Sequence, residues 1–167
     1  MRRRYVLASL PLLALARPAL ADVVWPALIV ESRILSWWVI GFGLVVEFFF
    51  VRWLFSLPWS RAALATVTAN AVSAILGIPL IPLSGIIWEL FPGSIYMALL
   101  KWGTFNPITW IATFFLACLV TTAIEALVYK RGFRLTVRRR EFSWLFVANA
   151  VSVGAAFVSL WLHPERF

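Results

Sequence analysis

Residues Thr66–Gly77 (TVTANAVSAILG) and Leu145–Ala156 (LFVANAVSVGAA) share the five-residue motif Ala-Asn-Ala-Val-Ser. Each copy places one asparagine, Asn70 or Asn149, in the middle of an apolar run. An unpaired side-chain amide is costly in apolar surroundings, so each asparagine needs a hydrogen-bond partner. The two stretches therefore predict membrane helices that bond to another helix through their asparagines.

The composition is that of an integral membrane protein. Of the 167 residues, 63% are hydrophobic and only 13% are charged, which is unlike a soluble domain. Ten Trp and fourteen Phe fit a chain with lipid-facing and interfacial surfaces. The net charge of +8 comes from basic residues clustered at the ends of apolar runs. Because that pattern is typical of membrane topology, we expect no nucleic-acid partner.

Four apolar runs are long enough to span a bilayer, which takes about 20 residues. We expect helices there, because a backbone exposed to lipid must satisfy its own hydrogen bonds. The sequence thus predicts an all-α membrane protein with four transmembrane helices. Their expected ranges are about 34–55, 62–81, 108–129 and 142–162.

The segment between the second and third helices, about 78–106, is too apolar for a solvated loop. Pro79, Pro82 and Pro92 are expected to break any continuous helix there, since proline removes a backbone donor. We therefore predict an interfacial or partly re-entrant segment, with a short helix over about 94–102 in the headgroup layer.

Residues 1–21 are typical of a signal peptide. A basic start, MRRR, precedes an apolar run and an Ala-Leu-Ala cleavage site before Asp22. The alternative is an uncleaved anchor, but the run is short for a span and contains Pro11. In either case Asp22 is expected on the outer side of a bacterial inner membrane, with residues 22–167 forming one membrane domain.

The basic residues predict the same orientation. With Asp22 outside, the loops after the first and third helices lie in the cytoplasm and hold most of the basic residues, as the positive-inside rule requires. Both ends of the mature chain are then periplasmic. The loop after the third helix could also bind anionic lipid headgroups, although its role in topology is a sufficient explanation. Its basic residues are Lys130, Arg131, Arg134, Arg138, Arg139 and Arg140.

The two halves of the chain resemble copies of one helical hairpin. Glu47 lies 23 residues before Asn70, and Glu125 lies 24 residues before Asn149. Each glutamate is followed five residues later by a basic residue. We predict a parallel internal repeat in which each glutamate faces its asparagine near the middle of the membrane.

These residues define a predicted polar site within the membrane. A charged side chain at the bilayer centre costs about 2.5–3.5 kcal/mol on insertion scales, so two carboxyls there need an explanation. Either the pairs only fix the register of each hairpin, or they form a site that handles protons or cations. The predicted site contains Glu47, Asn70, Ser73, Glu125, Asn149 and Ser152.

Small residues follow the same helices at a spacing of about one turn. Such ridges allow helices to approach closely and polar groups to bond across the gap. The predicted packing ridge comprises Ala65, Ala69, Gly77, Ala148 and Ala156.

Enzyme chemistry has no support in the sequence. No GxSxG, HExxH or Walker motif is present, and Cys118 and His163 are the only cysteine and histidine. We expect no catalytic residues, metal or cofactor. The first function to consider is a non-enzymatic accessory or scaffold subunit that packs through its ridges against itself or a larger membrane complex. The alternative is a small proton- or cation-coupled transporter or channel component, formed as a homo-oligomer, that uses the Glu/Asn pairs.

Overall fold

The computed structural model describes residues 26–162, and every regular element within that range is a helix. Four of the helices are long and apolar enough to cross a membrane, which confirms the prediction of an all-helical chain with four such segments. The expected signal peptide, residues 1–21, lies outside the described residues. The four helices are α2 (Trp37–Phe55), α3 (Trp59–Trp88), α5 (Pro107–Arg131) and α6 (Arg139–Leu162).

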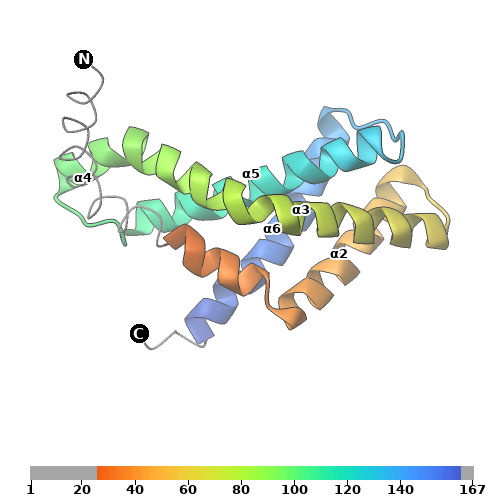
Figure 1. Cartoon of the computed structure of the whole chain (residues 1–167), viewed down its shortest axis with the longest axis horizontal. Helices are drawn as coiled ribbons and strands as arrows, with labels where there is room; N and C mark the ends of the chain where they lie inside the picture. The colour runs from red at the N-terminus through yellow and green to blue at the C-terminus, as the bar shows by residue number, and fades with distance from the viewer. Residues whose placement is uncertain (1–25, 163–167) are drawn as a thin grey trace, which may run out of the picture.

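The four long helices contact one another in a closed ring of order α2, α3, α5, α6. The most extensive packing runs between the two hairpins, α3 against α5 and α2 against α6. The α2–α3 and α5–α6 connections lie at the same end of the bundle, on the right in Figure 1. We call this end the loop end. A helical segment over residues 26–34 precedes α2.

The segment after α3 differs from the sequence prediction. Breaks at Pro79 and Pro82 were expected, and that expectation is wrong, because α3 continues through both prolines to Trp88. Proline already has a helical φ, and its missing hydrogen bond is tolerated in membrane helices, where neighbouring groups satisfy the freed carbonyls. The second helix therefore extends well beyond its expected end at residue 81.

The chain changes direction near Pro92 instead. Phe91 has an extended backbone (φ −170°, ψ 122°), as expected for a residue whose helical conformation clashes with a following proline. This residue lies within a short π-helical turn, η1 (Glu89–Gly93), which leads into α4 (Ser94–Leu100). A short helix in this part of the chain was predicted, and α4 confirms it.

Helix α5 begins where the sequence predicts. The Asn106 side chain accepts a hydrogen bond from the Thr109 backbone N–H at 2.9 Å and so caps the helix. Pro107 occupies the first helical position, where its missing N–H costs no helical hydrogen bond. The Asn-Pro pair therefore fixes the start of α5.

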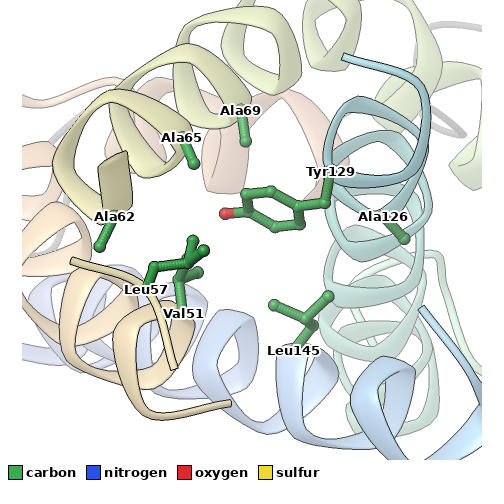
Figure 2. Packing of buried hydrophobic residues seen from close by; sticks show 8 residues of the cluster. All are labelled: Val51, Leu57, Ala62, Ala65, Ala69, Ala126, Tyr129 and Leu145. Carbon is green, nitrogen blue, oxygen red and sulfur yellow. The ribbon is translucent and has the colours of Figure 1, made fainter. Parts of the chain in front are cut away.

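Two apolar clusters fill the interior of the bundle. The cluster near the loop end contains Tyr129, whose ring projects from α5 toward Ala65 and Ala69 on α3 (Figure 2). The second cluster lies further from the loops and includes Ile81 on α3 and Cys118 on α5. Polar residues occupy the helical turns between the two clusters. The other labelled members of the first cluster are Val51, Leu57, Ala62, Ala126 and Leu145.

Candidate intramembrane binding site

The first hairpin joins its two helices through Glu47 and Asn70. The Asn70 Nδ2 donates to Glu47 Oε2, and it also donates to the Thr66 carbonyl one turn earlier, at 3.1 Å. Glu47 is only 3% exposed. The carboxyl is therefore held inside the bundle by an amide of the neighbouring helix.

The second hairpin has the same arrangement. The Asn149 Nδ2 on α6 donates to Glu125 Oε2 on α5 at 2.8 Å, and also to the Leu145 carbonyl at 3.2 Å. Glu125 is 1% exposed and Asn149 is 3% exposed. Each asparagine thus divides its amide between a carboxyl on the other helix and a carbonyl on its own.

Two serines join the hairpins to each other. The Ser73 hydroxyl on α3 donates to Glu125 Oε1 at 3.2 Å, and the Ser152 hydroxyl on α6 donates to Glu47 Oε1 at 3.1 Å. Each carboxyl therefore receives an amide from its own hairpin and a hydroxyl from the other. The structure brings all six predicted site residues into this one reciprocal network.

The identity of the neighbouring residues explains how the helices approach so closely. Gly43 lies one turn before Glu47 on the buried face of α2. A Cβ atom at Gly43 would lie 3.2 Å from the Ser152 Oγ, tighter than most real contacts of this kind. Glycine at this position therefore lets α6 place Ser152 against Glu47.

The predicted packing ridge is buried within the chain. Its alanines have no exposed surface, and Gly77 is also buried. The alanines are covered by neighbouring helices of the same molecule, and Gly77 borders a cavity between the helices. The ridge residues are therefore unavailable as a docking surface for a second protein. The four alanines are Ala65, Ala69, Ala148 and Ala156.

A cavity of about 300 Å³ adjoins the polar network, and all six predicted site residues line it. The rest of its wall is mainly aliphatic, with Val39 and Leu44 on α2, Val67 and Ile81 on α3, and Val153 on α6. An aliphatic pocket with a few convergent polar groups is the usual form of a small-molecule site.

Glu31 lines the same cavity. The sequence favours headgroup contact at the membrane interface for this residue, and it was not included in the predicted site. It lies in the helical segment that precedes α2, is 7% exposed, and its Oε1 atom has no hydrogen-bond partner. Burial raises the pKa of the Glu31 carboxyl above its ordinary value, because it removes water from the charged form. No sequence signal places it there, since the approach of this segment to the bundle is a tertiary contact.

Two further polar groups were missed on the loop-end side of the network. The Tyr129 hydroxyl and the Thr66 Oγ1 are both buried. Tyr129 follows Glu125 by one helical turn, and Thr66 precedes Asn70 by one turn. That spacing is the signal that could have identified both residues from the sequence.

The basic residues in and beside the α5–α6 connection lie outside this site. All six are exposed, and none of them lines the cavity. The first turn of α3 is bonded to the α5–α6 connection, because the Arg61 guanidinium donates to the Phe133 carbonyl at 3.2 Å. The six residues are Lys130, Arg131, Arg134, Arg138, Arg139 and Arg140.

Residues 26–162 contain no group of three or more His, Cys, Asp or Glu side chains arranged to hold a metal ion. Cys118 is buried in the second apolar cluster. No protein family matches the chain, and neither the curated proteins nor the solved structures contain a significant match. Any function of this chain must therefore be inferred from the geometry of the site.

Proposed function

We propose that this chain is a non-enzymatic, multi-pass protein of a bacterial inner membrane that handles protons or cations as a small transporter or channel component. One observation carries this proposal: two buried carboxyls, Glu47 and Glu125, line one cavity between the helices, which also reaches exposed residues such as Val67. A carboxyl inside a membrane is expensive and commonly marks an ion or proton path.

The cavity favours transport over a purely structural role for the glutamates. Carboxyls that served only to fix helix register would need hydrogen-bond partners but no adjoining space. Here each carboxyl has two donors and also borders the same cavity. A proton or cation entering the cavity would reach both carboxyls.

The accessory or scaffold function loses its main support. That hypothesis needed the small-residue ridge for packing against another protein, but the ridge residues are buried within the chain. Assembly as a homo-oligomer or within a larger complex stays a prediction, and it would require other surfaces.

The reciprocal hydrogen bonds support the parallel internal repeat. Each hairpin supplies one glutamate and one asparagine to its own pair, and one serine to the other carboxyl. We propose that α2–α3 and α5–α6 are copies of one hairpin. Exchange of the two hairpins by a rotation would then give each carboxyl an equivalent environment.

The positive-inside rule places the loop end in the cytoplasm. The segment over residues 26–34 would then lie on the periplasmic side, after a cleaved signal peptide. In this orientation Glu31 borders the periplasmic part of the cavity, while the cluster around Tyr129 separates the carboxyls from the cytoplasm.

Flux through reconstituted liposomes tests the proposed function. An acid-inside gradient across liposomes containing the protein should dissipate faster than across empty liposomes, as measured with an internal pH dye. Glu47→Gln and Glu125→Gln keep the shape of the side chain but remove its ionisable proton. Each should reduce the flux about tenfold or more, since the substituted position could no longer exchange a proton and the path through both carboxyls would be interrupted.

A matched control is Glu141→Gln, which changes an acidic residue at the start of α6 outside the cavity. It should retain the wild-type flux. Wild-type protein that conducts no faster than empty liposomes, or glutamine variants that conduct normally, would refute the proposal.

A further inference from the structure

We propose that the cavity binds one lipophilic organic cation, such as an amine or a quaternary onium group attached to apolar substituents. This inference assigns a ligand class to the site of the proposed function. It rests on that function only for the claim that the ligand is transported across the membrane. It is carried by the charge of the cavity, the chemistry of its wall and the unpartnered oxygen of Glu31.

The cavity carries acidic groups of one sign only. Glu31, Glu47 and Glu125 line it, and no lysine, arginine or histidine of the described residues does so. A low-dielectric wall strengthens the attraction between these carboxyls and a positive charge. The same carboxyls would repel an anion of the same size.

The wall is unsuited to an inorganic cation. Such ions need several oxygen ligands, six to eight in the case of calcium. Residues 26–162 contain no cluster of three metal-ligating side chains. The remaining surface is mainly aliphatic, which matches a ligand whose charge is shielded by its own apolar groups.

The described lining also contains no phenylalanine, tyrosine or tryptophan. Recognition by an aromatic cage is therefore not available in this part of the chain. The carboxyls must supply the attraction for the positive centre, and aliphatic contacts must supply the rest. Both carboxylate charge and ligand hydrophobicity are thus required for binding.

Glu31 gives the cavity a second charged position. Its Oε1 is buried without a hydrogen-bond partner, while the oxygens of the two deeper glutamates are each hydrogen-bonded. A buried acceptor without a partner is costly, and a ligand N–H or positive centre would satisfy it. We infer that the cation contacts Glu31 first and then Glu47 and Glu125.

The size of the cavity limits the ligand to one small molecule. Its volume of about 300 Å³ lies at the lower end of the range for small-molecule sites. The ligand class is therefore a compact organic monocation, and a polymer or a large peptide is excluded.

The test measures binding to the whole purified protein in detergent, with radiolabelled tetraphenylphosphonium as the probe. Tetraphenylborate has nearly the same size and shape but the opposite charge, so it controls for partitioning into micelles. Wild-type protein should bind the cation saturably, with a stoichiometry of about one, and should not bind the anion. Equal binding of both ions, or of neither, would overturn the inference.

Glutamine variants localise the binding. Glu47→Gln and Glu125→Gln should each weaken cation binding about tenfold or more, whereas Glu31→Gln should weaken it less and slow association. Glu141→Gln is the control outside the cavity and should bind as the wild type does. Unchanged affinity in both deep variants would place the cation elsewhere and reject the assignment.

The wild-type comparison of the two ions does not depend on any variant folding. Because binding in detergent needs no gradient, its outcome is also separate from the flux assay. Cation binding without flux would reject transport but retain the ligand class. Proton flux without cation binding would retain transport but reject the ligand class.

Discussion

At the scale of single residues, the central feature is that each buried carboxyl has two donors from two different helices. The asparagine amides and the serine hydroxyls satisfy Glu47 and Glu125 without introducing a basic residue. A lysine or arginine partner would neutralise each glutamate permanently. Neutral donors leave the charge of each carboxyl uncompensated, as the proposed exchange of protons or cations requires.

The asparagines should therefore contribute measurably to stability. Asn70→Ala and Asn149→Ala each remove a carboxyl donor, and we expect each to lower the free energy of unfolding by about 0.5–2 kcal/mol, the range typical of interhelical bonds in membranes. Unfolding of the purified protein by sodium dodecyl sulfate in mixed micelles measures this. Thr68→Ala, on the same helix as Asn70 and outside the network, should change the free energy of unfolding much less. An equal loss in all three variants would contradict a stabilising role for the asparagine hydrogen bonds.

Gly43 offers a second test at this scale, because Gly41 provides a matched control on the same helix. A Cβ atom at Gly43 would crowd Ser152, whereas one at Gly41 meets nothing within 4 Å. We expect Gly43→Leu to separate α2 from α6 and to destabilise the fold by about 1–3 kcal/mol, as overpacking does. Gly41→Leu should be neutral in the same unfolding assay, and similar effects of the two substitutions would exclude close packing at Gly43.

At the scale of helices, the spacing of small and polar residues determines which faces meet. On α3, Ala65, Ala69, Ser73 and Gly77 recur at one-turn intervals and are all buried. The outward faces instead carry exposed apolar residues such as Ile75 and Leu64. This is the division expected of a bundle whose interior is small and polar and whose surface faces lipid.

Bulky substitutions in the ridge test whether it packs within the chain. Ala69→Leu and Ala148→Leu should each destabilise the isolated protein by about 1–3 kcal/mol, because neither site has room for a larger side chain. Ala63→Leu places the same side chain on the exposed face of α3 and should be tolerated. If the ridge variants instead kept full stability and only lost a co-purifying partner on native gels, the scaffold hypothesis would regain its support.

Sequence periodicity predicted the long helices and the Glu–Asn contacts because both depend on local spacing. Glu47 and Asn70 lie on helices joined by a short turn, so matched depth along each helix was enough to pair them. The serine contacts between hairpins could not be predicted, since Ser152 and Glu47 are 105 residues apart and meet only through tertiary packing. The continuation of α3 through Pro79 was missed because the expected break applied a soluble-helix rule to a membrane helix.

At the scale of the whole molecule, the cavity lies between two hairpins that pack mainly against each other. The α3–α5 and α2–α6 interfaces are the most extensive, and each carries one Ser–Glu hydrogen bond. Movement of one hairpin against the other would therefore change the donors of both carboxyls together. Such coupled rearrangement is the behaviour expected of transporters built from two repeats.

Orientation in the membrane decides which compartment the cavity faces, and single cysteines can determine it. Cys118 is buried, so the background reaction with a thiol reagent should be low. Ser32→Cys and Thr136→Cys both introduce exposed thiols without altering the basic residues. In spheroplasts, a membrane-impermeant maleimide should label Ser32→Cys at once and Thr136→Cys only after lysis, because the positive-inside rule places the basic loop in the cytoplasm. The reverse pattern would show that the bundle is inverted. The proposed cation would then enter the cavity from the cytoplasm, and the Tyr129 cluster would lie on the periplasmic side.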